Sequence, residues 1–453
     1  MLTVLVAALA LGVGGGGLPV KTPAAVGMSA KRLASIDRVV NRGITAGGYP
    51  GAAVVVGRKG AAVWQKGFGR LSWDTADEHV KADETIYDLA SLTKVVGTTT
   101  AIMVLFDDGK IDLDAPVSRY LPDFQGEGKD AVTLRLLLEH RSGLPADRDL
   151  WRLPHDPTAT KLSVLGTPLV CKPGDCYIYS DLGAITLGMV VEAISGEPLD
   201  VFLAERVYGP LRMNNTFFRP ADSLKAHIAP TELTPPRGYP LRGEVHDENA
   251  YALGGIAGHA GLFSTAADLS IFAQMMLNGG VYNGTRVLSD STIKYFTQRA
   301  AGSRALGWAM ADGQWGSGRF LGDHSYGHVG YTGTSLWIDP DAQMFVVLLT
   351  NRVHAARAKR PAQVISDVRA DLADLASLAV MDRGGEIAAM PAHFRADLAR
   401  NWNRPERHKR RHHAKVSTRG KHGKAGSKAK ASKSRTKAKS HVATKSGKRV
   451  AHR

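Results

Sequence analysis

The sequence predicts an α+β fold in which strands from the two ends of the chain share one antiparallel sheet. Two short runs, 52–57 and 61–68, have the composition of strands and are separated by three turn-forming residues, as in a hairpin. Two further strand-like runs, 333–338 and 345–350, flank an Asp-Pro-Asp turn. The segments between these pairs have helical spacing, so we expect a mostly helical subdomain inserted between the strands, with helices flanking the sheet.

Apolar residues recur at helical intervals in several segments, which we expect to form helices. In chain order these segments are 30–42, 89–106, 132–139, 182–194, a short stretch near Val201, 266–277 and 362–378. The second of them is apolar almost all round, which is typical of a helix buried in a domain. No internal repeat is evident.

Basic residues gather at one end of the chain. Residues 404–453 hold 19 of the 58 Lys and Arg residues but one of the 42 acidic residues, which leaves 39 basic and 41 acidic residues elsewhere. The body is therefore almost neutral, whereas this tail carries a formal charge of +18. The tail has too few apolar residues to bury, so we expect it to be disordered. Its charge suits a polyanion such as a cell-wall polymer, anionic lipid or nucleic acid, although a solubilising tail without a partner remains open. Sequence-specific recognition of nucleic acid is not expected, because the tail carries no folded nucleic-acid-binding motif.

The first residues form a short apolar stretch, 2–13, followed by four glycines. It is too short to span a bilayer and resembles the apolar part of a secretory signal, but no basic residue precedes it. We expect a signal-like leader over 1–20 and a periplasmic or secreted protein. Cys171 and Cys176 flank a Pro-Gly turn, so a disulfide is expected in an oxidising compartment, while two free thiols remain possible.

Ser91 and Lys94 are the first candidate catalytic residues. They lie three residues apart in the apolar segment 89–106, so one helical face brings the hydroxyl and the amine together. Burial alone lowers the pKa of a lysine and allows it to accept a proton, and a serine beside such an amine is a candidate nucleophile. The alternative is a lysine that reaches solvent from a helix end, with a serine nearby by chance.

Two other segments carry candidate site residues. Tyr179 and Asp181 lie where a loop enters a helix, and the alternative role of Asp181 is to cap that helix. Residues 327–335 contain His328 and three glycines, Gly327, Gly330 and Gly333, and we expect this segment to open a strand that a substrate backbone can approach closely.

These segments, in this order, resemble the serine β-lactamase and penicillin-recognising DD-peptidase superfamily, especially its class C-like branch. The family pattern is S-x-x-K, then Y-x-N, then K/H-x-G, and the matching segments here are Ser91–Lys94, Tyr179–Asp181 and His328–Gly330. The stretches 138–145 and 255–265 also look like the family. The resemblance covers roughly 25–378, and the joint order and spacing make it specific although each motif alone is weak.

The resemblance implies a serine hydrolase that acts through an acyl-enzyme, with no cofactor or metal. Ser91 would be the nucleophile, and Lys94 and Tyr179 would carry the serine proton to the leaving group. By position in the family pattern, the N–H groups of Ser91 and Tyr331 would form the oxyanion hole. Asp181, His328, Gly330 and Tyr331 would bind substrate.

Two departures from the family pattern affect the mechanism. Asp181 replaces the usual Asn, and its carboxylate should keep Lys94 charged and shift the general-base role toward Tyr179. Val329 replaces the usual Thr or Ser, which removes a hydroxyl that would bind a substrate carboxylate. With His328 in place of Lys, we expect weaker recognition of that carboxylate and no potent β-lactamase activity.

Other kinds of site are less well supported. Asp323, His324 and His328, or His246, Asp247 and His259, invite a metal interpretation, but no metal-binding motif is present. We expect residues 246–249 to shape the rim of the site.

The resemblance therefore implies a hydrolase acting on D-alanyl cell-wall peptides or related small amides and esters, a DD-carboxypeptidase or β-lactamase relative. An esterase or D-amino-acid amidase on the same fold and a non-catalytic polyanion-binding protein are the alternatives. The expected organisation is a leader over 1–20, the hydrolase domain over 25–380, a linker over 381–403 and the basic tail over 404–453.

Overall fold

The computed structural model describes residues 17–232, 237–383, 388–398 and 402–403. The tail over 404–453 and most of the leader over 1–20 lie outside the described residues. The helices are α1 Ala30–Leu33, α2 Ser35–Thr45, α3 Thr100–Asp107, α4 Leu134–Leu138, α5 Pro157–Leu165, α6 Asp181–Ser195, α7 Leu199–Leu203, α8 Gly209–Leu211, α9 Glu248–Ala252, α10 Ala266–Leu277, α11 Asp290–Thr297 and α12 Pro361–Leu378. The strands are β1 Gly51–Arg58, β2 Ala61–Gly69, β3 Tyr87–Asp88, β4 Phe217–Phe218, β5 Leu262–Ser264, β6 Val281–Tyr282, β7 Thr285–Arg286, β8 Ala309–Met310, β9 Tyr326–Val329, β10 Ser335–Asp339 and β11 Met344–Thr350.

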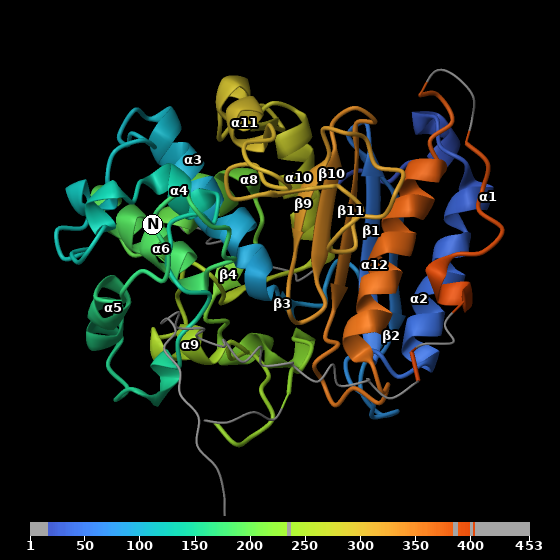
Figure 1. The fold of residues 1–453 in the computed structure, drawn as a ribbon. Helices are drawn as coiled ribbons and strands as arrows, with labels where there is room; N and C mark the ends of the chain where they lie inside the picture. The colour runs from blue at the N-terminus through green and yellow to red at the C-terminus, as the bar shows by residue number, and fades with distance from the viewer. Residues whose placement is uncertain (1–16, 233–236, 384–387, 399–401, 404–453) are drawn as a thin grey trace, which may run out of the picture. The chain divides into compact units, whose positions relative to one another are not determined.

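The main sheet joins the two ends of the chain, as predicted. Its order is β2-β1-β11-β10-β9-β8, and its paired strands run antiparallel (Figure 1). At its centre β1 pairs with β11, with Val54 opposite Leu348. Strand β10 begins two residues later than expected, because Gly333, at φ 109°, belongs to the preceding turn.

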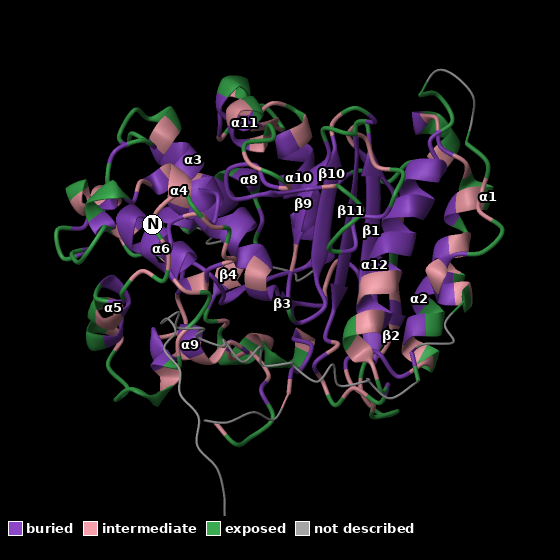
Figure 2. Ribbon diagram, viewed as in Figure 1, coloured by how far each residue is buried: buried purple, intermediate pink, exposed green. Residues whose placement is uncertain are grey.

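Helices cover both faces of this sheet, so its central strands are buried on both sides (Figures 1 and 2). Side chains alternate between two cores along β1: Val54 and Val56 pack under α2 and α12, whereas Ala53 and Val55 face the helical subdomain. The single helix expected over 30–42 is wrong. The helix is interrupted at Ala34, which separates α1 from α2.

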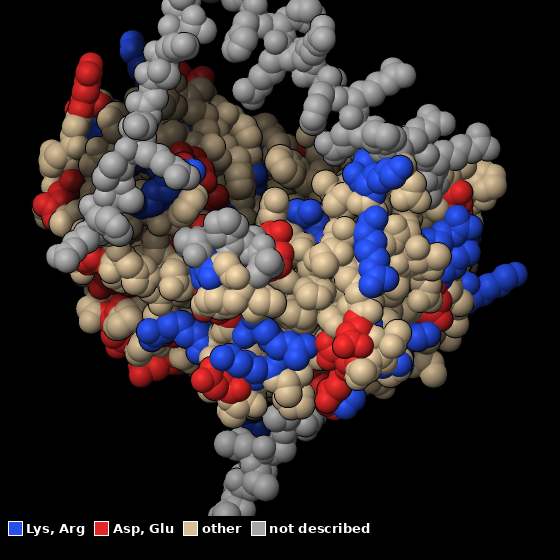
Figure 3. Space-filling view, turned by 90° about the horizontal axis from the view of Figure 1, so that it is seen from below, with Lys and Arg blue, Asp and Glu red and all other residues tan. Residues whose placement is uncertain are grey.

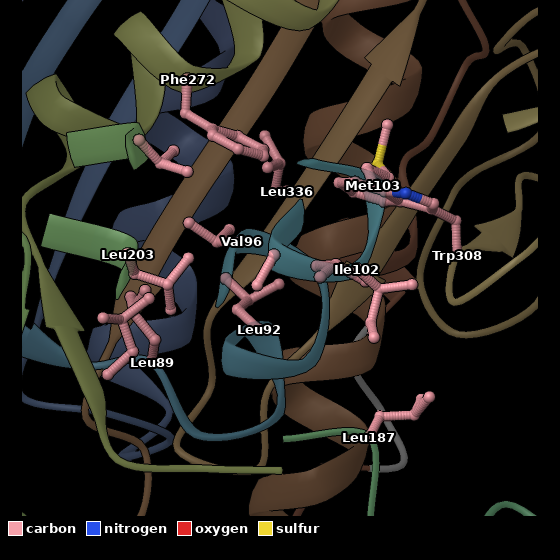
Figure 4. Close-up of a cluster of buried hydrophobic side chains, with 14 of the residues drawn as sticks. Leu89, Leu92, Val96, Ile102, Met103, Leu187, Leu203, Phe272, Trp308 and Leu336 are labelled. Carbon is pink, nitrogen blue, oxygen red and sulfur yellow. The ribbon is translucent and has the colours of Figure 1, made fainter. Parts of the chain in front are cut away.

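The apolar segment after β3 is helical but not one uniform helix. It runs as a 3₁₀ turn (Ala90–Leu92), a π-helical stretch (Thr93–Thr99) and then α3. Among the described residues it is the single helical segment long and apolar enough to cross a membrane, and 83% of it is buried inside the domain. Core side chains surround it, including Phe272 of α10 and Leu336 of β10 (Figure 4). Packing within the domain therefore accounts for its apolar character.

Two segments that we expected to lie outside the domain are instead part of it. Leu18 is buried in the core, and Val20 bridges to Ala62 on the edge strand β2. In the expected linker over 381–403, Phe394 and Trp402 are buried against the core beneath α12. The domain therefore extends to Trp402 at one end and to Leu18 at the other. Its surface carries interspersed acidic and basic side chains on the face shown in Figure 3, as its near-neutral charge predicts.

Replacing Trp402 should test whether this last segment stabilises the domain. Trp402 is 1% exposed, and its Nε1 donates to Asp367 Oδ2 at 2.7 Å. We expect Trp402→Ala to lower the free energy of unfolding by roughly 3–5 kcal/mol, the usual cost of truncating a buried aromatic residue. The matched control is Leu398→Ala in the same segment, where the side chain is exposed. Equal denaturant midpoints for the two variants would contradict this packing.

Candidate active site

Ser91 is held in a strained turn at the start of the buried helical segment. The preceding residue, Ala90, has φ 47°, a left-handed conformation that costs a residue with a side chain about 1 kcal/mol or more. Asp88 stabilises this turn, because its Oδ1 accepts the Ala90 N–H at 2.8 Å. The turn leaves Ser91 half-buried, with its side chain at the wall of a pocket.

Lys94 lies beneath Ser91 and is surrounded by oxygen atoms. Its Nζ donates to Ser91 Oγ at 3.0 Å and to the His259 carbonyl at 3.1 Å, and it forms an ion pair with Asp181 Oδ1 at 2.7 Å. The ammonium group thus makes two hydrogen bonds and one ion pair. The predicted meeting of Ser91 and Lys94 is therefore present, and the alternative of a lysine reaching solvent is wrong, since Lys94 is 4% exposed.

The charge of Lys94 follows from its neighbours. Burial alone would lower its pKa, but the negative charge of Asp181, with a further contribution from Tyr179, outweighs burial and raises the pKa above its usual value. The lysine is an ammonium at neutral pH. This agrees with the expectation that the carboxylate at position 181 keeps it charged.

Tyr179 reaches the same place from the loop before α6. Its ring centroid lies 5.1 Å from Lys94 Nζ and 4.6 Å from the ring of His140. Burial, and then the charge of Arg304, hold the pKa of His140 well below its usual value, so its neutral Nδ1 can accept the Ser180 N–H at 3.1 Å. His140 thereby fixes the backbone next to Tyr179.

Ser180, and not Asp181, caps helix α6. The Ser180 hydroxyl accepts the Gly183 N–H at 3.1 Å. The capping alternative for Asp181 is therefore wrong, and its carboxylate remains available to pair with Lys94. The preceding loop is closed by a disulfide between Cys171 and Cys176, as expected.

The third predicted segment forms the opposite wall of the pocket. His328 lies on a strand of its own, β9, and not at the opening of β10 as expected, while Gly330 and Tyr331 form the turn between the two strands. Thr332 and Thr334 in this turn donate their hydroxyls to the carbonyls of Asp88 (2.8 Å) and Leu89 (2.9 Å). These bonds tie the turn directly to the residues that precede Ser91.

Gly330 is required by this close approach. A Cβ at position 330 would lie 2.3 Å from the Leu89 carbonyl oxygen, which no real side chain tolerates. Next to it, the backbone N–H of Tyr331 has no hydrogen-bond partner among the described residues. It lies in the turn that borders the pocket, where we expected an oxyanion donor.

His328 is a neutral imidazole. Burial, followed by the positive charges of Arg304 and Lys94, holds its pKa well below the usual value. Its Nδ1 lies 2.9 Å from the Val329 carbonyl, which can only accept, so Nδ1 carries the proton and Nε2 is left as an acceptor. His328 therefore contributes no positive charge to the pocket.

The pocket has a volume of about 250 Å³ and brings together most of the predicted residues. It is lined by Ser91, Tyr179, His328, Val329, Gly330, Tyr331, Arg304, Ala309, Trp315, Arg352, Ala362, Ile365 and Arg369. Lys94 and Asp181 lie beneath it, in contact with Ser91 through the lysine. The three arginines were not predicted, because single arginines in loops and on a helix carry no motif or periodic signal.

Of the four histidines that invited a metal interpretation, His328 contacts the Val329 carbonyl and the other three pair with carboxylates. His246 Nε2 contacts Glu232, His259 Nε2 lies 2.8 Å from Asp247, and His324 Nδ1 lies 3.0 Å from Asp341. In the described ranges, no group of three or more His, Cys, Asp or Glu side chains is placed to hold a metal ion.

Comparison with known proteins identifies the family. The model of the family described as "Beta-lactamase" matches residues 36–406. The chain belongs to the beta-lactamase family. It is 34% identical to the "N-acetylmuramyl-L-alanine amidase" of Bacillus subtilis (strain 168), over 72% of this chain and 82% of that protein. It is also 34% identical to a protein of Escherichia coli (strain K12) named "Putative D-alanyl-D-alanine carboxypeptidase", over 74% of this chain and 85% of that protein.

A solved structure supports the same fold. A penicillin-binding protein homologue from Caulobacter crescentus superposes with a TM-score of 0.59 at 22% identity, covering 72% of this chain and 93% of that one. The predicted α+β fold and the resemblance to the β-lactamase and DD-peptidase superfamily are therefore confirmed. As a member of this family, the protein is a serine hydrolase.

Asp181→Asn should move the pH–rate profile of Ser91 acylation to lower pH. The carboxylate raises the pKa of Lys94, so removing its charge leaves burial as the main influence, and the lysine then loses its proton at lower pH. In this variant the neutral amine becomes a second base for the Ser91 proton, which it is not while Asp181 keeps it charged. The rate of acylation by a fluorescent penicillin or an activated ester, measured from pH 5 to 10, tests this. An unchanged profile would contradict control of the Lys94 charge by Asp181.

Proposed function

We propose that this serine hydrolase removes the terminal D-alanine from cell-wall peptides. In this mechanism Ser91 Oγ attacks the carbonyl carbon of the penultimate D-alanine, the C–N bond breaks, and water later hydrolyses the acyl-Ser91 ester. Because Lys94 is already an ammonium, Tyr179 acts as the proton shuttle: its oxygen takes the serine proton as its own hydroxyl proton passes to the leaving amine. The N–H groups of Ser91 and Tyr331 stabilise the oxyanion.

The observation that carries this proposal is the concentration of positive charge beside Ser91. Arg304, Arg352 and Arg369 line the pocket, and its described lining residues include no Asp or Glu. Arg304 is 2% exposed, donates Nε and Nη2 to the Tyr177 hydroxyl, and leaves Nη1 without a partner in the described part of the chain. A buried unpaired N–H of a cation is costly, and a carboxylate is its natural partner.

The other two arginines are held by the pocket walls. Arg369 Nη2 donates to the carbonyls of Gly330 (2.6 Å) and Thr334 (2.8 Å), and burial lowers its pKa to about 9. Arg352 stacks over the ring of Tyr331 with its Cζ 4.4 Å from the centroid. Together the three cations offset the hydroxyl lost at Val329, so the weaker carboxylate recognition expected from the sequence is replaced by recognition through arginine. In a D-alanyl-D-alanine peptide, the free carboxylate lies one residue beyond the scissile bond, which suits this arrangement.

A second candidate is cleavage of the amide between N-acetylmuramic acid and L-alanine, the activity named for the Bacillus subtilis relative. That substrate has no carboxylate next to the scissile bond on the leaving side, so the arginines favour the D-alanyl substrate. Esters and D-amino-acid amides remain alternatives on the same machinery.

The proposal is tested by incubating the protein with a D-Ala-D-Ala muropeptide and measuring D-alanine release by mass spectrometry. Release should require a free terminal carboxylate, Ser91→Ala should abolish it, and fluorescent penicillin should label Ser91. Arg304→Gln should raise KM for the peptide roughly tenfold or more, the cost of losing a charge-assisted bond of about 1.5–3 kcal/mol. Hydrolysis of p-nitrophenyl acetate, which has no carboxylate, is the matched control and should keep its KM.

Two outcomes would overturn the proposal. Equal hydrolysis of the peptide and its C-terminal amide would remove the role of the carboxylate. Cleavage of only the muramyl–L-alanine bond would establish the second candidate.

The location of the protein and the role of its basic tail are also proposals. We infer a periplasmic or secreted location from the leader and from the cell-wall-related names of the relatives. From the positive charge of the tail over 404–453 we infer that it attaches the protein to an anionic cell-wall polymer. Deleting residues 404–453 should abolish salt-sensitive co-sedimentation with purified cell walls while leaving turnover of p-nitrophenyl acetate within twofold. Unchanged co-sedimentation would contradict a role for the tail, and binding without turnover in either form would support the non-catalytic alternative.

A further inference from the structure

A second ion pair lies next to Lys94, and it joins the buried side chain of His259 to Asp247, whose side chain is 32% exposed. The side chain of His259 is 1% exposed, and its Nε2 lies 2.8 Å from Asp247 Oδ1. Burial alone would lower the pKa of His259 and raise that of Asp247, but their mutual attraction outweighs burial, so the pKa of His259 is raised and that of Asp247 is lowered. The contact with Asp247 therefore favours the protonated ring of His259, whose Nδ1 is buried and has no hydrogen-bond partner among the described residues. The mechanism proposed above uses neither side chain.

The backbone next to His259 is bonded to the helical segment that carries Lys94. The His259 carbonyl accepts from Lys94 Nζ at 3.1 Å. One residue earlier, the Gly258 carbonyl accepts from the Thr98 hydroxyl at 2.7 Å, and three residues later the Leu262 N–H donates to the Thr93 hydroxyl at 3.1 Å. These three bonds fix segment 258–262 in one register along the helical segment.

Segment 258–262 also packs closely against helix α6, which begins with Asp181. A Cβ at Gly258 would lie 2.1 Å from the Ala184 carbonyl oxygen, and a Cβ at Gly188 would lie 3.1 Å from Gly258 Cα. Segment 258–262 therefore contacts both elements that supply the Lys94–Asp181 ion pair. A displacement of the His259 carbonyl would move an acceptor of Lys94 and disturb its distance to Ser91.

We infer that Asp247 is a positioning residue, which acts through His259 to hold the Lys94 ammonium in line with Ser91 and Asp181. This inference rests on the proposed role of Lys94. Asp247 also accepts the Ala250 N–H at 2.8 Å and so caps α9, but an asparagine would serve that cap equally well. An asparagine would remove only the negative charge, which is what favours the protonated ring of His259. Asp88, Asp147 and Asp181 are the other acidic groups whose charges act on this pair.

The variant Asp247→Asn in the full-length protein removes the negative charge beside His259 and keeps an oxygen that can cap helix α9. We expect kcat for p-nitrophenyl acetate and the rate of Ser91 labelling by a fluorophosphonate to fall about tenfold or more, because small misplacements of catalytic groups have effects of this size. KM and the melting temperature should change little. Asp247→Glu, which keeps the charge, should recover part of the rate. Asp222→Asn, which removes an exposed negative charge that pairs with Lys225, is the matched control and should keep the rate within twofold.

The double variant Asp247→Asn with His259→Gln tests the route of the effect. If Asp247 acts through His259, the double variant should be no slower than the slower single variant. Additive losses, an unchanged kcat in Asp247→Asn, an equal loss in Asp222→Asn, or unfolding of Asp247→Asn at the assay temperature would each overturn the inference. Both probes need only a reactive serine, so a failure to release D-alanine refutes the proposed substrate alone. A wild-type protein that reacts with neither probe would refute both proposals.

Discussion

The candidate site depends on one buried cation. Lys94 is enclosed by the hydroxyl of Ser91, the carboxylate of Asp181 and the carbonyl of His259, which come from three separate parts of the chain. A buried ammonium is costly unless charged and polar partners compensate for its lost hydration. The positions of α6, the turn at Ser91 and segment 258–262 are therefore constrained together, because each supplies one of those partners.

The surrounding fold holds these partners with little freedom. The strained Ala90 is supported by Asp88, and the turn between β9 and β10 is bonded to the carbonyls of Asp88 and Leu89. The sheet thus fixes the candidate oxyanion donor at Tyr331 relative to Ser91. The outcome is a pocket whose lining is positively charged and whose underlying ion pairs balance their own charges. Arginines stand over the pocket, and the ion pairs of Lys94 and His259 lie beneath it.

Much of this arrangement could be predicted from the sequence. The strands of the sheet were recognisable because their apolar residues cluster in short runs between turn formers, and Ser91, Lys94 and Tyr179 because their spacing matches a known pattern. Strand β9 was missed, since Gly327 and Gly330 give it a loop-like composition. Burial of Trp402 and Leu18 was missed because isolated apolar residues show no period. Arg304 was missed for a similar reason: its importance comes from tertiary contacts with Tyr177 and the pocket, which local sequence does not encode.

The central claim is that Lys94 remains an ammonium in the resting enzyme. It is tested most directly by an NMR titration of the protein with ¹⁵N-labelled lysine side chains, with the Lys94 resonance assigned by comparison with Lys94→Arg. The account predicts that Nζ keeps its ammonium chemical shift throughout the neutral range and titrates above the usual lysine pKa of about 10.4. A Lys94 resonance that titrates near pH 7 would contradict it.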